Sequence, residues 1–344
     1  MRSVRFIFSI LMVALWSCAP EVEKKPVNIV WPPSPAEPKI ELVEIISSED
    51  DVKAEAEGGW LKSLIGDEKG FEGRLMRPYG VAVDRDGRIY VTDAGRVFIF
   101  DKKNKNLSFI VEKLGSERLK MPIGVAIGPD GRVYVSDATS DRVFIYNREC
   151  KCIGAIGSAG EFRSPAGLAI DTVRGSLYVA DTKKHSVRAY TLDGKFLFSL
   201  GEHDSDKGRF SFPTNIAVDS EGKIYVVDTG HFRVQVFNPD GKFFGTIEGG
   251  RPSLFARPKG IAIDSEGHIY VVDAASQKIY ILNKEGELFL SIGGGGIEPG
   301  KFSVPAGIAV DAEDRIYVAD QLNARVQVFQ YLSEKWKAMQ PRRK

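Results

Sequence analysis

The chain has few of the side chains that most often carry chemistry, with only 4 histidines and 3 cysteines among 344 residues. The lysine-plus-arginine and aspartate-plus-glutamate counts, 47 and 46, nearly cancel, so the basic excess that is typical of nucleic-acid-binding proteins is missing. No Cys-x-x-Cys-His haem attachment site is present. The composition therefore excludes covalently attached haem and does not indicate a nucleic-acid partner.

Long hydrophobic runs are also missing. The one extended apolar run, residues 6–16, is too short to span a bilayer comfortably as a helix. It follows a start that contains two arginines, an order that is typical of a secretory signal. Residues 15–18 resemble the lipobox of bacterial lipoproteins, whose cysteine is lipidated and becomes the new N-terminus. We therefore predict a signal peptide over residues 1–17 and a lipid anchor at Cys18.

These predictions place the protein in a bacterial cell envelope, held to a membrane and facing the periplasm or the cell surface. An ordinary cleaved signal, in which Cys18 is incidental, is the alternative. Six prolines between residues 20 and 38 favour extended polyproline geometry. Residues 41–57 are acidic apart from an apolar patch at 42–46, which we expect to lie against the domain. We predict a Pro-rich and acidic tether over residues 18–58.

One stretch recurs six times along the rest of the chain. Each copy opens on a proline, continues through an aliphatic–alanine–aliphatic triplet and ends on Tyr-Val-x-Asp. The opening prolines lie 43 to 48 residues apart. Such a period, built from short apolar runs that turn signals separate, predicts a propeller or another repeat array. The six copies are 78–93, 122–137, 165–181, 213–228, 258–273 and 305–320.

Each copy reads as one blade of four antiparallel strands. Period-two alternation puts the alanine of the first strand on one face and its two larger neighbours on the other. Neighbouring blades are then expected to interdigitate large against small residues near the axis. The alanines are Ala82, Ala126, Ala169, Ala217, Ala262 and Ala309.

The sixth copy stops after its third strand. Residues 60–66, which precede the first copy, have the pattern of an outer strand, and we predict that they pair with residues 325–330. Closure of this kind removes the two open sheet edges. The fold class is therefore all-β: a monomeric six-bladed β-propeller of four-stranded antiparallel blades over residues 59–331, closed by an N-terminal outer strand. Residues 332–344 form a basic C-terminal tail.

The repeated residues resemble NHL repeats, which have Pro-x-Gly-[Ile/Val]-Ala-[Val/Ile]-Asp, Tyr-Val-x-Asp and Arg-Val-Gln-Val-Phe elements. The match covers about 270 residues of the chain. The family's Asp-x-x-Asn-x-Arg element is intact only at 320–325. We interpret the aspartate that ends each copy as a hydrogen-bond acceptor that holds the loops, since a catalytic role would not need one in every blade. These residues are Asp93, Asp137, Asp181, Asp228, Asp273 and Asp320.

Strand direction sorts the loops between the two mouths of the ring. The loops that lead into the first strands, here called the lead-in loops, share one mouth with the loops that join second to third strands. We call this mouth the lead-in face; the opposite mouth carries the Asp-Gly turns. Every blade contributes a cation to the lead-in face, which predicts an anionic partner, with a merely solvated rim as the alternative. The cations are Arg74, Arg77, Arg118, Lys120, Arg163, Arg209, Arg257, Lys259 and Lys301.

Blade four differs from the others, with Asn215 in place of the usual glycine, beside Phe212 and Thr214. A specific pocket, if there is one, is expected there. The residues predicted to bind a partner are Arg74, Arg77, Tyr79, Lys120, Arg163, Arg209, Phe212, Thr214, Asn215, His231, Arg257 and Lys259.

Catalytic side chains are not indicated. Amidating lyases built on NHL repeats hold zinc with three inward histidines, and no inner strand here carries one. Gluconolactonase-like propellers coordinate a divalent cation with carboxylates and amides at the axis, and only Asn215 occupies a comparable place. His185 and His231 lie in neighbouring loops and are candidate metal ligands only if they meet. We predict no catalytic residue, metal or cofactor.

The Cys150-Lys151-Cys152 sequence leaves three interpretations open. Two thiols at this spacing can bind a soft metal or form a strained disulfide, or they are a chance pair in a tolerant turn.

The leading functional hypothesis is a non-enzymatic binding or scaffold module that takes a protein, a peptide or an anionic envelope polymer on its lead-in face. The rival is a hydrolase or lyase that uses a divalent metal at the axis. Carboxylates that converge with Asn215 on the axis would support the rival, and an alanine-lined channel would favour the binding module.

Overall fold

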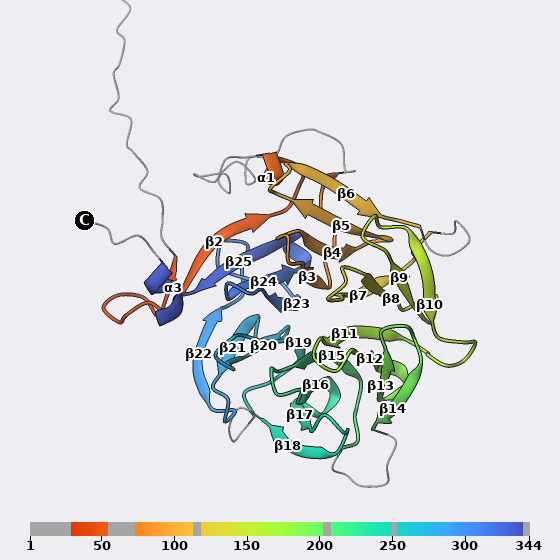
Figure 1. The fold of residues 1–344 in the computed structure, drawn as a ribbon. Coiled ribbons are helices and arrows are strands. Elements are labelled where there is room, and N and C mark those ends of the chain that lie inside the picture. Colours follow the sequence, from red (N-terminus) through yellow and green to blue (C-terminus); the bar gives the residue numbers. More distant parts are fainter. Residues whose placement is uncertain (1–28, 54–72, 113–117, 202–207, 249–252, 340–344) are drawn as a thin grey trace, which may run out of the picture.

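The computed structural model describes residues 29–53, 73–112, 118–201, 208–248 and 253–339, and its strands form six sheets around a common axis (Figure 1). Blade one consists of β3 (Val81–Val83), β4 (Ile89–Asp93), β5 (Arg96–Asp101) and β6 (Asn106–Ile110). Blade two consists of β7 (Pro122–Ile127), β8 (Val133–Asp137), β9 (Arg142–Tyr146) and β10 (Cys152–Ile156). Blade three consists of β11 (Pro165–Asp171), β12 (Ser176–Asp181), β13 (Ser186–Thr191) and β14 (Phe196–Leu200).

The second half of the ring repeats this pattern. Blade four consists of β15 (Pro213–Val218), β16 (Ile224–Asp228), β17 (Arg233–Phe237) and β18 (Phe243–Ile247). Blade five consists of β19 (Pro258–Ile263), β20 (Ile269–Asp273), β21 (Lys278–Leu282) and β22 (Leu288–Gly293). Blade six consists of β23 (Pro305–Val310), β24 (Arg315–Asp320), β25 (Arg325–Tyr331), β2 (Ile40–Ile46) and β1 (Val30–Trp31). The predicted all-β six-bladed propeller is confirmed.

Ring closure uses an N-terminal strand, as predicted, but not the predicted one. β2 lies beside β25 (Figure 1) and pairs with it antiparallel, with Ile40 opposite Tyr331 and Ile46 opposite Val326. β1 extends the sheet by a fifth strand. The assignment of this role to residues 60–66, which lie outside the described residues, is wrong because β2 occupies the outer edge of β25. Part of the segment that composition assigned to the tether thus belongs to the propeller, and its apolar patch is the closing strand.

The expected interdigitation of alanines and larger residues between blades is confirmed. Ala82 of blade one packs in one buried cluster with Val125 and Ile127 of blade two. Ala309 of blade six packs in the same way with Val81 and Val83 of blade one. Each of the six core clusters lies between two neighbouring blades, so the hydrophobic core is a ring of interfaces rather than one central mass.

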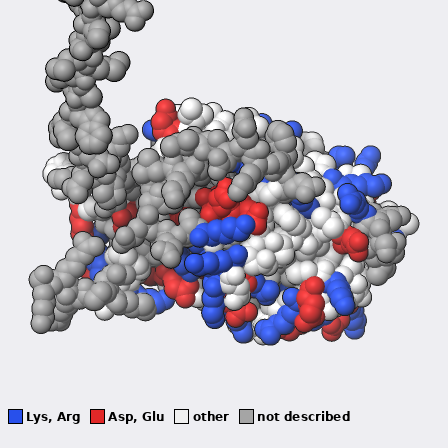
Figure 2. Space-filling model, turned by 90° about the horizontal axis from the view of Figure 1, so that it is seen from above, with Lys and Arg blue, Asp and Glu red and all other residues white. Residues whose placement is uncertain are grey.

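The remaining elements are short. α1 (Asp50–Lys53) follows β2, α3 (Glu334–Met339) follows β25, and the 3-10 turns η2 (Thr182–Lys184), η3 (Thr229–His231) and η4 (Gln321–Asn323) join second to third strands. None of the helices in the described ranges is long and apolar enough to cross a membrane. On the face that Figure 2 shows, seen from above the view of Figure 1, lysines and arginines are intermixed with acidic residues.

Candidate functional site

A buried aspartate at the end of each second strand holds the lead-in loop of its own blade. In blade one, Asp93 accepts hydrogen bonds from the backbone N–H groups of Met76 and Arg77, at 2.6 and 2.8 Å. This confirms the interpretation of the six aspartates as loop-holding acceptors. The pairs are Asp93 with Met76 and Arg77, Asp137 with Lys120 and Met121, Asp181 with Arg163 and Ser164, Asp228 with Ser211, Asp273 with Ala256 and Arg257, and Asp320 with Ser303.

Four of the predicted cations are themselves the residues whose backbones are held in this way. The N–H groups of Arg77, Lys120, Arg163 and Arg257 donate to their aspartates at 2.7 to 2.8 Å. All four residues are exposed, and within the described part of the chain none of them forms an ion pair with a carboxylate. The four cations, here called the held cations, therefore project from rigid attachment points on the lead-in face.

Glu161, an acid near Arg163 in the sequence, is engaged elsewhere. Its carboxylate accepts hydrogen bonds from the N–H and hydroxyl groups of Ser158, at 2.9 and 3.0 Å, and from the hydroxyl of Tyr190, at 2.7 Å. Burial acts to raise the pKa of Glu161, but these hydrogen bonds outweigh it and the pKa lies below its ordinary value. Glu161 is thus ionised at neutral pH and committed to the body of blade three.

Blade four presents an aromatic side chain, Phe212, directly before its opening proline, the position that Arg77 and Arg257 occupy in blades one and five. The backbone N–H of Phe212 donates to Nδ1 of His185 at 3.2 Å instead of to an aspartate, and the two ring centroids are 4.6 Å apart. Phe212 has φ 53° and is 50% exposed, a conformation that bulky residues rarely adopt. The contact with His185 therefore holds the Phe212 ring outward on the lead-in face.

The two histidines that were candidate metal ligands have separate partners. His185 accepts from Phe212, whereas Nδ1 of His231 lies 2.9 Å from Oδ2 of Asp228. No group of three or more histidine, cysteine or acidic side chains able to hold a metal occurs among the described residues.

Thr214 joins blade four to blade five. Its hydroxyl lies 2.8 Å from that of Thr229 and donates to the carbonyl oxygen of Lys259 at 2.9 Å.

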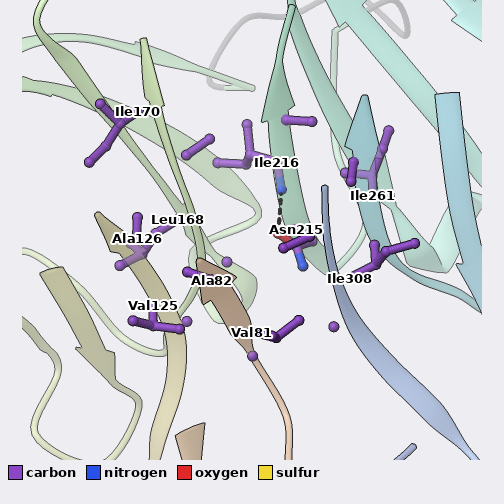
Figure 3. Close-up of a pocket in the computed structure, with 18 of the residues that line it drawn as sticks. Val81, Ala82, Val125, Ala126, Leu168, Ile170, Asn215, Ile216, Ile261 and Ile308 are labelled. Carbon is purple, nitrogen blue, oxygen red and sulfur yellow. Dashed lines mark hydrogen bonds between the residues drawn. The ribbon is translucent and has the colours of Figure 1, made fainter. Parts of the chain in front are cut away.

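A channel of about 250 Å³ runs between the six inner strands (Figure 3). Each inner strand is the last strand of its sheet, so its unpaired backbone edge faces the axis. Most side chains along the wall are alanines and branched aliphatics; the described lining also includes Tyr79, Thr172 and Thr214, and Asn215 is its one amide. Oδ1 of Asn215 accepts from the N–H of Ile216 at 2.8 Å (Figure 3), which leaves its Nδ2 group available on the channel side.

Comparison with known proteins places this architecture in a family. Residues 67–256, more than half of the chain, match the model of the SMP-30/Gluconolactonase/LRE-like region. The chain belongs to this family. The NHL repeat model matches residues 255–281 and 302–329, in agreement with the resemblance seen in the sequence. A search of curated proteins finds no match.

Solved structures similar to this SMP-30/gluconolactonase-family chain share its fold at low identity. A streptogramin B lyase is 13% identical with a TM-score of 0.58, covering 74% of this chain and 94% of that one. A virginiamycin B lyase from Staphylococcus aureus is 14% identical with a TM-score of 0.58, covering 85% and 99%. Hydrazine synthase from Kuenenia stuttgartiensis is 14% identical with a TM-score of 0.55, covering 78% and 99%. These similarities show the fold alone.

The axial residues of this SMP-30/gluconolactonase-family chain do not fit a divalent cation. Ca²⁺ and Mg²⁺ are held by oxygen ligands that include carboxylates. The described residues that line the channel include no aspartate, glutamate or histidine, and Oδ1 of Asn215 already accepts a backbone hydrogen bond. The donor set is therefore too small and uncharged for the axial divalent metal of the rival hydrolase or lyase hypothesis.

The structure separates the other predicted binding residues into two groups. Tyr79, Thr214 and Asn215 line the channel. Arg74 and Arg209 form the second group, whose backbones are paired with other segments. Arg74 is half-buried and forms an isolated antiparallel β-bridge with Ser48, which follows the closing strand. The carbonyl oxygen of Arg209 accepts a hydrogen bond from the side chain of Gln235 at 2.6 Å. The role of His185 in holding Phe212 was missed, because nothing in the local pattern distinguishes a loop histidine that accepts a backbone hydrogen bond.

Proposed function

We propose that this chain is a non-enzymatic binding propeller of a bacterial cell envelope, anchored through a lipidated Cys18, that takes a carboxylate-rich protein or peptide segment on its lead-in face. The observation that carries the proposal is the set of held cations, whose backbones are tied to buried aspartates. Because their attachment points are ordered before a partner arrives, binding loses less conformational entropy than it would with mobile loops.

The expected energies are modest per contact and useful in sum. An exposed ion pair contributes roughly 0.2–1 kcal/mol, so four such contacts contribute about 1–4 kcal/mol. Any contribution above about 1.4 kcal/mol strengthens binding more than tenfold. The contribution falls as salt screens exposed charges. The outward ring of Phe212 adds an apolar contact that salt does not weaken.

The test is the binding of a labelled polyglutamate peptide to the wild-type chain and to two charge-reversed variants. The first variant changes the held cations: Arg77→Glu, Lys120→Glu, Arg163→Glu and Arg257→Glu. The matched control reverses four exposed cations on the opposite mouth: Arg85→Glu, Lys151→Glu, Lys195→Glu and Lys284→Glu.

We expect salt-dependent binding by the wild type, at least tenfold weaker binding by the first variant and little change in the control. Equal weakening in both variants would show that overall charge, not the held cations, attracts the peptide. Failure of the wild type to bind polyglutamate at low salt would rule out the acidic partner.

Membrane attachment is tested separately. Wild-type protein expressed in a bacterium is expected in the membrane fraction after a high-salt wash, because acyl chains add about 0.8 kcal/mol of membrane affinity per buried methylene. The Cys18→Ser variant is expected in the soluble fraction. Equal membrane retention of both would remove Cys18 as the anchor.

A lactone or ester hydrolase is the second candidate, favoured by membership of the SMP-30/gluconolactonase family and by the Nδ2 group of Asn215 in the channel. The variant Asn215→Gly restores the residue of the other five blades and serves as the test. Hydrolysis of an aliphatic lactone that Asn215→Gly abolishes would support this candidate. No hydrolysis with any added divalent cation would rule it out.

A further inference from the structure

The turn between β9 and β10 brings two thiols to the boundary between blades one and two. Cys150 and Cys152 are both half-buried and neither belongs to a disulfide, whereas Lys151 between them is exposed. Both cysteine side chains pack against the same core cluster, which contains Tyr90 and Tyr146. Both side chains therefore face the interface between blades one and two. The thiol of Cys152 also donates to the carbonyl oxygen of Gly154 at 3.6 Å.

The backbone of this turn does not account for a cysteine at position 150. Cys150 has φ 61°, a left-handed conformation that costs an L-residue roughly 1–2 kcal/mol. The corresponding turns of blades three, four and five carry Gly194, Gly241 and Gly286, with φ between 84° and 88°. Position 150 therefore carries a thiol, although glycine would form the same turn with less strain.

A second observation at the same place is an unpartnered hydroxyl. Tyr146 stands directly opposite Cys152 in the β9–β10 register and is fully buried. Its hydroxyl has no hydrogen-bond partner among the described residues, which costs about 1–3 kcal/mol for a buried polar group. In blade three the equivalent Tyr190, opposite Phe196, donates to Oε1 of Glu161 at 2.7 Å.

We propose that Cys150 and Cys152 together bind one copper(I) ion as a pair of thiolates, and that the hydroxyl of Tyr146 donates to a metal-bound sulfur. Binding releases the two thiol protons to solvent and forms two copper–sulfur bonds without a change of oxidation state. The hydroxyl of Tyr146 gains in the thiolate the acceptor that it lacks.

The choice of metal follows from the donor set. Thiolates are soft ligands that favour copper(I), zinc and iron–sulfur clusters. An iron–sulfur cluster is held by four cysteines, more than the chain contains. A structural zinc ion needs four ligands, and the described part of the chain offers no third histidine, cysteine or carboxylate that could join these two sulfurs. Copper(I) accepts two-coordinate binding, so a pair of thiolates is sufficient for it.

The experiment measures copper(I) binding without oxygen, in competition with a copper(I)-specific chromogenic chelator. Every sample is the full chain with Cys18→Ser, so that the thiols at 150 and 152 are the only ones. We expect one copper(I) per chain, and at least a hundredfold weaker binding by Cys150→Ser and by Cys152→Ser. The double variant, with both cysteines changed to serine, is expected to bind copper(I) as weakly as either single variant. Retention of the ion by the double variant would overturn the proposal.

Tyr146→Phe separates metal binding from structural damage. Removal of a buried hydroxyl that lacks a partner is not expected to lower the thermal stability of the metal-free protein. Loss of a hydrogen bond to a metal ligand is expected to weaken copper(I) binding about tenfold or more. Unchanged copper affinity in Tyr146→Phe would contradict the assigned role of this hydroxyl.

The chain offers a matched control in blade three. Gly194→Cys with Phe196→Cys, made in the chain with Cys150→Ser and Cys152→Ser, moves the same Cys-Lys-Cys sequence opposite Tyr190. Because the hydroxyl of Tyr190 already donates to Glu161, the moved pair is expected to bind copper(I) about tenfold more weakly. Equal affinity would mean that any turn with this Cys-Lys-Cys sequence binds copper(I) equally well and that blade two has no specific copper site.

Discussion

The backbone N–H of Gly307 in the last blade donates to the carbonyl oxygen of Tyr79 in the first blade at 2.8 Å. A Cβ atom at Gly307 would lie 2.3 Å from the same oxygen. The same close approach recurs at Gly80, whose Cβ would lie 2.4 Å from the carbonyl oxygen of Ile123. The inner strands of neighbouring blades thus approach so closely that the repeated glycine is a packing requirement and not a turn signal.

Gly307→Ala is therefore expected to lower the free energy of unfolding by about 1–3 kcal/mol, because the added methyl group forces two backbones apart. Gly245→Ala is the control, since a Cβ there meets nothing within 4 Å and alanine is favoured over glycine in a strand. Denaturant unfolding measures both. A similar effect of the two changes would contradict the close-approach argument.

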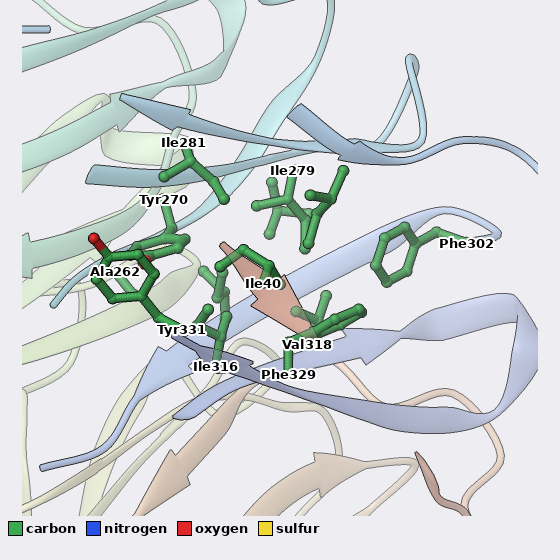
Figure 4. Close-up of a cluster of buried hydrophobic side chains, with 13 residues drawn as sticks. Ile40, Ala262, Tyr270, Ile279, Ile281, Phe302, Ile316, Val318, Phe329 and Tyr331 are labelled. Carbon is green, nitrogen blue, oxygen red and sulfur yellow. The ribbon is translucent and has the colours of Figure 1, made fainter. Parts of the chain in front are cut away.

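Ring closure by β2 predicts a sharp difference between two truncated chains. Figure 4 shows Ile40 of β2 lying among Tyr331, Phe329 and the side chains of blade five. A chain that begins at residue 39 retains β2 and is expected to melt cooperatively. A chain that begins at residue 47 exposes the edge of β25 and is expected to aggregate or to melt at a much lower temperature. Equal melting temperatures would show that another segment closes the ring.

The Asp264–His268 pair predicts a pH dependence of stability. Nδ1 of His268 lies 2.9 Å from Oδ2 of Asp264, which also accepts from the hydroxyl of Tyr270 at 2.8 Å. The hydrogen bond with Asp264 raises the pKa of His268 above its ordinary value, and burial opposes this. The resulting stabilisation is complete below the unfolded-state pKa of about 6.5 and is lost as the pH rises through the raised folded-state value.

We therefore expect the melting temperature to fall from pH 6 to pH 9 by more in the wild type than in His268→Arg. Arginine occupies this position in blades one and six, where Arg88 and Arg315 each pair with an aspartate at 2.7 Å. Its charge does not titrate in this range. The ring of His268 also packs on Phe289 and Tyr331. The nearby charges of Glu266 and Asp314 raise the pKa of His268 further. An identical pH profile in both proteins would exclude the pair as the cause.

Removal of an aspartate that holds a lead-in loop is expected to lower the free energy of unfolding. Asp181→Ala leaves the N–H groups of Arg163, Ser164 and Lys184 without their carboxylate, and we expect a loss of about 3 kcal/mol or more in the free energy of unfolding. Asp240→Ala, in an exposed turn, is expected to change it by about 0.5 kcal/mol or less. Amide hydrogen exchange at residues 163 and 164 gives the local measurement. Unchanged protection there in Asp181→Ala would remove the basis for a pre-ordered lead-in face.

Local and repeated features of this protein could be read from the sequence. The six copies of Pro-x-Gly-aliphatic-Ala-aliphatic specify six blades, because each copy contains the alternation that buries Ala82 or its counterpart against the next blade. The aspartates could be interpreted from repetition alone. The outward turn of Phe212 could not, since it depends on His185, which lies 27 residues away and belongs to another blade.

The amino-acid sequence by itself determined the number of blades, the alternation of small and large residues between them and the aspartates that hold the loops, because each depends on residues that are neighbours along the chain or recur at a constant period. Only the tertiary structure decided which N-terminal segment closes the ring. Two stretches with apolar residues, 40–46 and 60–66, precede the first copy, and the sequence pattern favoured the second of them. The structure selects the first through its pairing with β25, nearly three hundred residues away. Such a pairing depends on edge register and loop closure, which a local pattern does not encode.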